Sequence, residues 1–159
     1  MIPFRLFYAT ISTPNRDRLS AWYQEKLGFE LFINKDFPEF GTRIAVLALY
    51  DFRLEILEQA NAVPMPLPQN DPPDHTNVHC FSQIALLVED LDEAISALES
   101  KGVEKVWVLR DDPTLKLKFQ FFKDCDGRLL QFVELYPEAK SHMTDLIRAY
   151  PHKFSYLPE

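Results

Sequence analysis

The chain is poor in glycine, in cysteine and in clustered basic residues, and each shortage excludes a class of protein. Only four of its 159 residues are glycine and no glycine-rich phosphate loop occurs, which argues against a nucleotide cofactor. Two cysteines, Cys80 and Cys125, are too few for a disulfide framework and favour reduced thiols over a bridge. A net charge of −7 without a Lys/Arg cluster argues against nucleic acid and against an anionic membrane surface.

Long apolar runs are also lacking. No stretch approaches the roughly 20 apolar residues that span a bilayer. Residues 1–12 lack the basic start and the long apolar core of a signal peptide. Hydrophobic residues make up 47% and charged residues 26% of the chain, which is typical of a globular protein with its own core. We therefore expect a cytoplasmic protein with no membrane partner.

The first half of the chain shows a strand, a helix and three more strands. Residues 5–13 alternate in the way that predicts a strand. Asn15 is a suitable N-cap for a following helix and Gly28 a suitable C-cap. Between these caps, apolar residues recur at helical spacing: Leu19, Trp22, Tyr23 and Leu27. Three strand-like runs follow, at residues 29–36, 42–50 and 52–59.

The second half repeats this order. Asp90 is the predicted N-cap of its helix and Gly102 caps the helix end. Strand-like runs lie at residues 80–88, 105–110, 116–123 and 128–135. Gly28 corresponds to Gly102 and Glu55 to Gln131, at a shift of roughly 75 residues, and such an internal repeat determines the architecture. The sequence therefore predicts an α+β fold of two βαβββ modules in tandem, whose sheets bury their helices on one face and form a cup with the other.

Two segments fall outside the repeat. Residues 61–78 contain five prolines among polar residues, which is typical of a connector or of a flap over a site. Residues 137–159 form a predicted helical tail, which either docks on its own body or contributes to a homodimer. Its apolar face consists of Met143, Leu146, Ile147 and Tyr150. The predicted organisation is one domain at residues 1–136 (modules at about 4–60 and 79–136, connector 61–78) followed by the tail at 137–159.

Four segments carry a resemblance to a known family: residues 8–15 (YATISTPN), 21–29 (AWYQEKLGF), 83–91 (QIALLVEDL) and 122–131 (FKDCDGRLLQ). In this order they resemble the strand openings, the helix end and the last hairpin of the vicinal oxygen chelate superfamily. That superfamily includes glyoxalases, bleomycin-resistance proteins and extradiol dioxygenases. The resemblance runs from about residue 5 to residue 135, with Cys125 where the family usually has proline. It implies the two-module cup and a small-molecule ligand.

In the family, four inward positions hold His, Glu or Gln and bind one divalent metal. By motif position they fall on Tyr8, Glu55, Gln83 and Gln131, and only Glu55 keeps a strong ligand type. One carboxylate, two amides and a phenol make a weak set for Mg²⁺ or for Zn²⁺-like ions. We therefore expect no cofactor. A divalent metal, if one binds, would be held by these four residues.

The same four residues suggest chemistry without a metal. If Glu55 is buried, desolvation would raise its pKa and make it a usable general acid or base. The Tyr8 hydroxyl could donate a hydrogen bond to a substrate oxygen, and Gln83 and Gln131 could orient a carbonyl or a hydroxyl. Alternatively, hydrogen bonds to Tyr8 and Gln83 satisfy Glu55, which then has no chemical role.

Three further residues are predicted ligand contacts. His79 shares strand parity with Gln83 and could reach the rim of the cup, although a lone histidine is more often a surface or core residue. Phe121 and Trp107 fall near the cup, where aromatic walls suit an apolar or aromatic ligand. Core packing is the alternative for these rings. The other histidines, His75 among them, form no cluster with metal-ligand spacing.

Three functions remain open. The chain is a lyase or isomerase that acts on a small carbonyl or aromatic compound with Glu55 as acid/base. Alternatively, it is a bleomycin-resistance-type protein that sequesters a drug or metabolite without chemistry. The third possibility is a metal-dependent enzyme with an atypical ligand set. The fold alone does not separate them, because one fold hosts many reactions.

Overall fold

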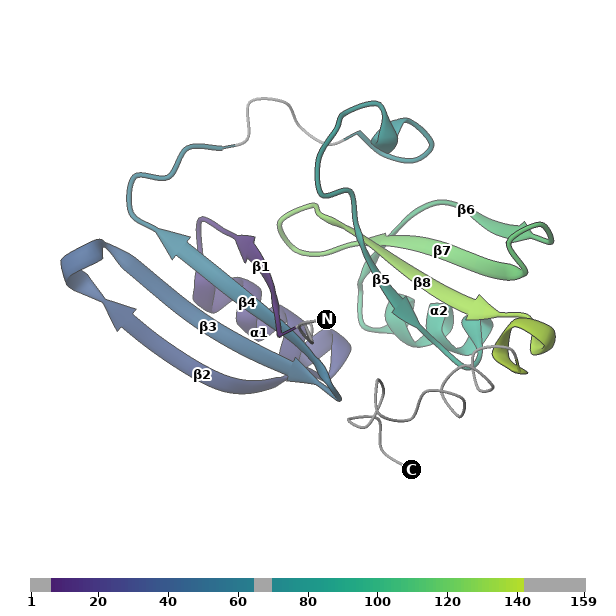
Figure 1. Ribbon diagram of the computed structural model, residues 1–159, viewed down its shortest axis with the longest axis horizontal. Coiled ribbons are helices and arrows are strands. Elements are labelled where there is room, and N and C mark those ends of the chain that lie inside the picture. Colours follow the sequence, from purple (N-terminus) through teal and green to yellow (C-terminus); the bar gives the residue numbers. More distant parts are fainter. Residues whose placement is uncertain (1–6, 65–69, 142–159) are drawn as a thin grey trace, which may run out of the picture. The chain divides into compact units, whose positions relative to one another are not determined.

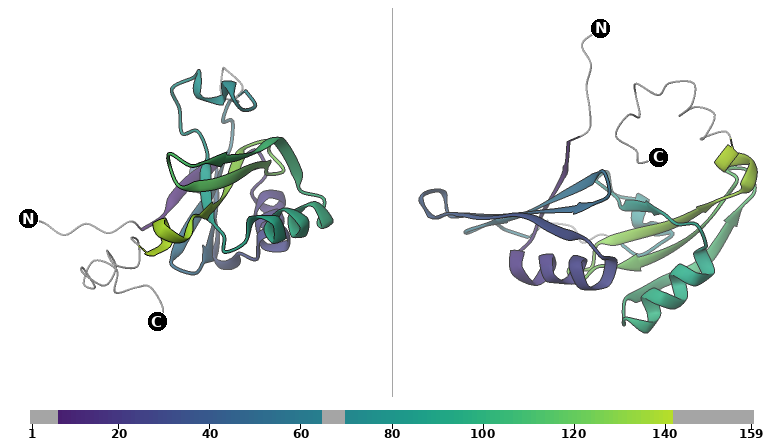
Figure 2. Two further views of the ribbon diagram at one scale, coloured as in Figure 1. Left: turned by 90° about the vertical axis from the view of Figure 1, so that its right-hand side faces the viewer. Right: turned by 90° about the horizontal axis from the view of Figure 1, so that it is seen from below.

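The computed structural model describes residues 7–64 and 70–141 and divides into two compact units, Met1–Pro66 and Leu67–Glu159. We call them unit 1 and unit 2. Each contains a four-stranded sheet and one α-helix that runs across one face of that sheet (Figures 1 and 2). Within the described residues, no helix is both long enough and apolar enough to cross a membrane.

Unit 1 begins with a strand and a helix and continues as an antiparallel meander. Its elements are β1 (Ala9–Ser12), α1 (Arg16–Leu27), β2 (Glu30–Phe37), the 3₁₀ turn η1 (Pro38–Phe40), β3 (Thr42–Leu49) and β4 (Phe52–Gln59). The strand order is β1-β4-β3-β2, and β1 pairs parallel to β4. The other pairs are antiparallel, as the short connections between these strands require.

Unit 2 has the same topology. Its elements are η2 (Asp74–Thr76), β5 (Ile84–Leu87), α2 (Leu91–Ser100), β6 (Glu104–Asp112), β7 (Leu117–Lys123) and β8 (Leu129–Leu135). The order is β5-β8-β7-β6, with β5 parallel to β8. Residues 137–141 form a short helix after β8. The predicted α+β fold of two βαβββ repeats is confirmed.

Both helices are capped at the N-terminus by two side chains at corresponding positions. In α1, the Asn15 side chain accepts from the third helical N–H at 2.9 Å, and Glu58 of β4 accepts from the first at 2.7 Å. In α2, Asp90 and Glu134 of β8 accept from the corresponding N–H groups, both at 2.9 Å. Two otherwise unpaired backbone donors are thereby satisfied in each helix. The glutamates also fix each helix N-terminus to the last strand of its own sheet.

The core of each unit lies between its sheet and its helix. Side chains that alternate along the central strands point toward the helix and are almost fully buried. The largest fully buried apolar side chains of helix and sheet together are Leu19, Tyr23, Leu47, Leu54 and Ile56 in unit 1 and Leu91, Phe122, Leu129 and Leu130 in unit 2. Phe122 packs against Phe132, with ring centroids 5.5 Å apart. Phe122 is therefore a core residue.

Some predicted boundaries differ from the structure. β5 begins at Ile84, four residues later than the strand predicted at residues 80–88, so His79 lies outside any strand. The 50–51 hairpin turn forms without glycine, because Tyr50 takes the left-handed conformation with φ 52°. No disulfide joins the two cysteines. The apolar face predicted for the tail lies outside the described residues, so its role in docking or in a homodimer stays a prediction.

A network of charges fixes the start of α1 to the sheet of unit 1. Arg16 is only 4% exposed, and its guanidinium donates to Asp17 at 2.8 Å and also pairs with Asp36. Arg43 of β3 donates to Asp17 at 2.5 Å and to Glu58 at 3.1 Å. Hydrogen bonds from Arg43 and then from Arg16 hold the pKa of the Asp17 carboxyl below its ordinary value.

This shift predicts how stability depends on pH. A carboxyl whose pKa is lowered in the folded state stabilises the fold above its unfolded pKa of about 3.9, and this contribution is lost as pH falls through the folded value. We therefore expect Asp17→Asn to be less stable than the parent at pH 6 and to lose less stability between about pH 4 and pH 2. Urea unfolding across this range measures the difference. Asp51→Asn, in the exposed 50–51 turn, is the control, and parallel pH profiles for Asp17→Asn and the parent would refute the argument.

Candidate functional site

The candidate site in unit 1 lies on the sheet face that α1 leaves open. Thr10 of β1, Glu55 of β4 and Val46 of β3 are direct neighbours in the strand register and share one face. Leu54 and Ile56, on either side of Glu55, are fully buried on the opposite face. Because side chains alternate along a strand, burial of these two neighbours places the Glu55 carboxylate on the open face.

A cavity of about 220 Å³ opens on this face. Its walls are mainly aromatic and aliphatic, and three charged side chains border it. The lining residues are Phe7, Tyr8, Phe32, Ile33, Lys35, Phe37, Ile44, Val46, Arg53 and Glu55. An apolar pocket with a few polar groups is the usual form of a small-molecule site.

Glu55 is half-buried and is held by one hydroxyl. Thr10 Oγ1 donates to Glu55 Oε2 at 2.7 Å. Among the described residues, the Glu55 carboxylate has no other hydrogen bond or ion pair. The sequence reasoning considered Tyr8 and Gln83 as its partners and missed Thr10. The sequence offered one signal for Thr10, because it lies two residues after Tyr8 and so has the same parity in the strand predicted at residues 5–13.

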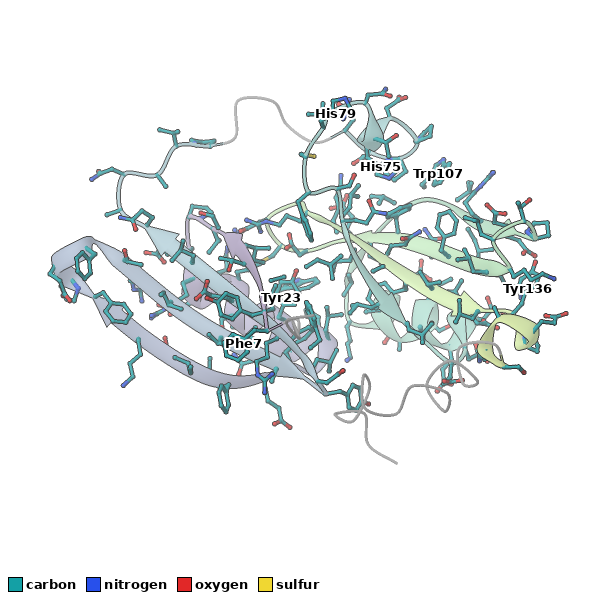
Figure 3. All side chains as sticks on the ribbon, in the orientation of Figure 1. Phe7, Tyr23, His75, His79, Trp107 and Tyr136 are labelled. Atoms are coloured by element: carbon teal, nitrogen blue, oxygen red, sulfur yellow. The ribbon has the colours of Figure 1, made fainter. Side chains whose placement is uncertain are left out.

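The predicted site residue Tyr8 lines this cavity. Its side chain is 42% exposed, and its ring centroid is 5.1 Å from that of Phe7, which is labelled in Figure 3. The guanidinium of Arg53 lies over the Phe7 ring, 5.6 Å from its centroid. Arg53 and Lys35 are cavity residues that the sequence reasoning missed. A cation beside an aromatic wall could attract an anionic or carbonyl oxygen.

In unit 2, the predicted pair Gln83 and Gln131 comes together. Gln83 Nε2 donates to Gln131 Oε1 at 3.3 Å. Gln131 is the direct neighbour of Ala85 in the β5–β8 register, and it lies on the face opposite α2. The two amides therefore contact each other, a contact that the sequence did not predict.

The predicted aromatic contacts also lie in unit 2. Phe121 is 2% exposed and its ring centroid is 6.3 Å from that of Trp107. Trp107 has a φ of 64° at an irregularity of β6, where the β6–β7 register shifts between Val106 and Arg110. Gln120 Nε2 donates to the carbonyls of Val106 at 2.8 Å and Trp107 at 3.2 Å, which stabilises this unusual backbone.

The two histidines before β5 differ. His79 is exposed, and within the described residues it makes no hydrogen bond or ring contact. His75 instead lies against Phe121, with ring centroids 5.1 Å apart. Figure 3 shows His75 near Trp107, and His79 farther along the segment that leads to β5. The structure thus brings His75 to the predicted aromatic contacts and leaves His79 outside them.

Comparison with known proteins assigns the chain to a family. The family model described as Glyoxalase/Bleomycin resistance protein/Dioxygenase superfamily matches residues 5–132. The chain belongs to this superfamily. No curated protein sequence matches it.

Solved structures of glyoxalase proteins share the fold. A glyoxalase family protein from Enterococcus faecalis is 28% identical with a TM-score of 0.68, over 82% of this chain and 97% of that one. A glyoxalase family protein from Bacillus cereus is 19% identical with a TM-score of 0.66, over 86% and 97%. Glyoxalase I from Leishmania major is 18% identical with a TM-score of 0.64, over 96% and 99%. The last two show likeness of fold only.

This glyoxalase-superfamily chain departs from the family at the metal positions. The Glu55 carboxylate already accepts a hydrogen bond from Thr10, and Gln131 Oε1, the oxygen that would bind a metal, accepts from Gln83. Across residues 7–64 and 70–141, no group of three or more His, Cys, Asp or Glu side chains is placed to hold a metal ion. One carboxylate, two amides and a phenol do not fit a tightly held divalent cation.

Proposed function

We propose that this glyoxalase-superfamily protein binds a small, largely apolar or aromatic organic molecule on the open face of the unit 1 sheet, with Glu55 as the main polar contact. A single observation carries this proposal. A half-buried carboxylate, held by the Thr10 hydroxyl, borders a cavity whose other walls are mostly aromatic and aliphatic. Such a site offers burial to a ring or alkyl group and a hydrogen-bond acceptor to a hydroxyl or N–H.

The same geometry supports acid/base chemistry of the lyase or isomerase type. The carboxylate oxygen that Thr10 does not contact could take a proton from a carbon beside a ligand carbonyl and return it elsewhere. Arg53 and Lys35 border the same cavity and could stabilise the oxygen on which negative charge develops. We propose that this chemistry needs no resident metal, because one carboxylate, two amides and a phenol form a weak ligand set for a divalent cation.

The proposal predicts the behaviour of Glu55→Gln. This change keeps the shape and leaves an oxygen to accept from Thr10, but it removes the charge. Hydrogen bonds to charged groups contribute about 1.5–3 kcal/mol, so the Kd of a ligand that donates to Glu55 should rise about tenfold or more. The ligands would come from a thermal-shift screen of aromatic and carbonyl compounds that carry a hydroxyl or N–H. Calorimetric titration of the hits then measures Kd.

Glu30→Gln is the matched control, because Glu30 is an exposed carboxylate at the start of β2 and does not line the cavity. Hits that bind the parent and Glu55→Gln equally would contradict the proposed site. Mass spectrometry of the incubated hits separates the remaining functions. For an acid/base enzyme, Glu55→Gln should slow product formation by about 10²–10⁴-fold. Binding without any product would support the sequestering, bleomycin-resistance type of function instead.

A further inference from the structure

The second part of the proline-rich connector is packed onto the sheet of unit 2. The Asp71 carboxylate lies 2.7 Å from the Lys123 ammonium, and the hydrogen bond between them raises the pKa of Lys123. Pro72 is buried, and the His75 ring meets the Phe121 ring edge-on at 5.1 Å. Lys123 and Phe121 are alternate residues of β7, so both contacts are made on one face of the sheet.

That face also carries the two glutamines. Phe121 is the direct neighbour of Gln131 in the β7–β8 register, and Gln131 accepts from Gln83. His75, Phe121, Gln131 and Gln83 therefore form a continuous strip across the face of the sheet opposite α2. We call these four residues the unit 2 strip. Its first member comes from the connector, which the sequence presented as a linker or a flap.

Two buried polar atoms in this strip have no partner. Among the described residues, the only buried side-chain nitrogen or oxygen atoms without a hydrogen bond are His75 Nδ1 and Gln83 Oε1. Folded proteins nearly always pair such atoms with protein, ordered water or ligand. The occurrence of both in one strip therefore points to a molecule that binds there.

The aromatic side chains beside the strip indicate the shape of that molecule. Trp107 lies 6.3 Å from Phe121 and 6.4 Å from Phe119, measured between ring centroids. The Arg110 guanidinium lies 5.2 Å from the Trp107 ring centroid. Trp107 keeps a positive φ in a strand, which is uncommon for a large side chain, and unusual backbone of this kind is often found at functional sites. Flat aromatic surfaces suit a planar ring compound.

We propose that the unit 2 strip binds a planar ring compound that carries an N–H or O–H donor, and that the connector supplies His75 as one of its polar contacts. Gln83 Oε1 accepts from the donor of the ring compound, and His75 Nδ1 pairs with a second polar atom. The proposal uses residues of unit 2 alone and does not depend on Glu55.

Two probes test the part played by Gln83. The first is 2-quinolinone, a planar bicyclic lactam with one N–H donor and one carbonyl, and the second is its N-methyl derivative, which lacks the donor. Calorimetric titration of the full chain should show that 2-quinolinone binds at least tenfold more tightly. Gln83→Leu should abolish this preference. Absence of measurable binding of 2-quinolinone, or equal affinity for the two probes, would overturn the proposal.

A second comparison tests His75 itself. His75→Phe keeps a ring against Phe121, so the connector can stay packed, but it removes both nitrogens. It should weaken 2-quinolinone binding at least tenfold while the melting temperature stays near that of the parent. His79→Phe, which changes the neighbouring exposed histidine, and Glu55→Gln should leave this affinity unchanged. An unchanged affinity in His75→Phe overturns the role of His75, and a loss in Glu55→Gln would assign the probe to the unit 1 site instead.

Discussion

Replacement of Tyr23 by alanine should lower the free energy of unfolding of unit 1 by about 3–5 kcal/mol, as for other large aromatic side chains in cores. Tyr23 is 1% exposed and lies at the centre of the apolar face of α1. Its ring meets Phe29 edge-on, with centroids 5.3 Å apart, and lies 5.2 Å from the Trp22 ring. The change removes the aromatic ring that α1 packs onto the sheet and leaves a cavity that the surrounding side chains can only partly close.

The two tryptophans allow this loss to be assigned to one unit. Trp22 lies in α1 of unit 1 and Trp107 in β6 of unit 2. In a Trp107→Phe background, urea unfolding followed by Trp22 fluorescence reports on unit 1. In a Trp22→Phe background, Trp107 fluorescence reports on unit 2. Tyr50→Ala is the control, because Tyr50 is 89% exposed and its loss should change stability by less than about 0.5 kcal/mol. A loss below about 1 kcal/mol for Tyr23→Ala would contradict the packing argument.

Local chemistry made most of the fold predictable. The caps Asn15 and Asp90 lie where the sequence placed them, and the strand predicted at residues 52–59 is β4 to the residue. Caps and alternation depend on the nearest few residues, so they can be read without tertiary information. The internal repeat also aligned Gln131 with Glu55, but the contact between Gln131 and Gln83 was not predicted.

Contacts between distant segments could not be predicted in the same way. The Thr10–Glu55 hydrogen bond depends on the register of β1 against β4, which no local pattern determines. The prediction of His79 used strand parity across residues 79–83, but β5 pairs with β8 only from Ile84 onward. His75 reaches Phe121 because the connector packs on unit 2, and its sequence context of prolines and polar residues gives no sign of that packing.

The second large effect is expected at Arg16, where the two repeats differ. Arg16 and Leu91 are the first residues of α1 and α2 and correspond at the repeat shift of about 75 residues. Leu91 is 1% exposed and simply fills its core, whereas Arg16 is 4% exposed and carries a charge. Its guanidinium donates to Asp17 at 2.8 Å and to the Lys35 carbonyl at 3.1 Å, and it also pairs with Asp36.

Arg16→Leu therefore copies unit 2 at this position but leaves the acidic partners in place. Three carboxylates, those of Asp17, Asp36 and Glu58, would then share the single guanidinium of Arg43. Removal of one partner of a buried ion pair costs about 3–5 kcal/mol, and we expect about 2–3 kcal/mol here because Asp17 and Asp36 are more than half exposed and can be hydrated. Urea unfolding followed by Trp22 fluorescence measures this loss.

A second substitution separates the charge effect from packing. Addition of Asp36→Asn to Arg16→Leu restores the original balance of the network and should recover part of the lost stability, because one unpaired carboxylate is removed. Arg18→Met is the control, because Arg18 is an exposed residue of the same helix. It should change the free energy of unfolding by less than about 0.5 kcal/mol. If Asp36→Asn further destabilised the Arg16→Leu protein, the loss would have to come from packing at the start of α1. Arg16 would then stabilise unit 1 through the way its side chain packs and not through its charge.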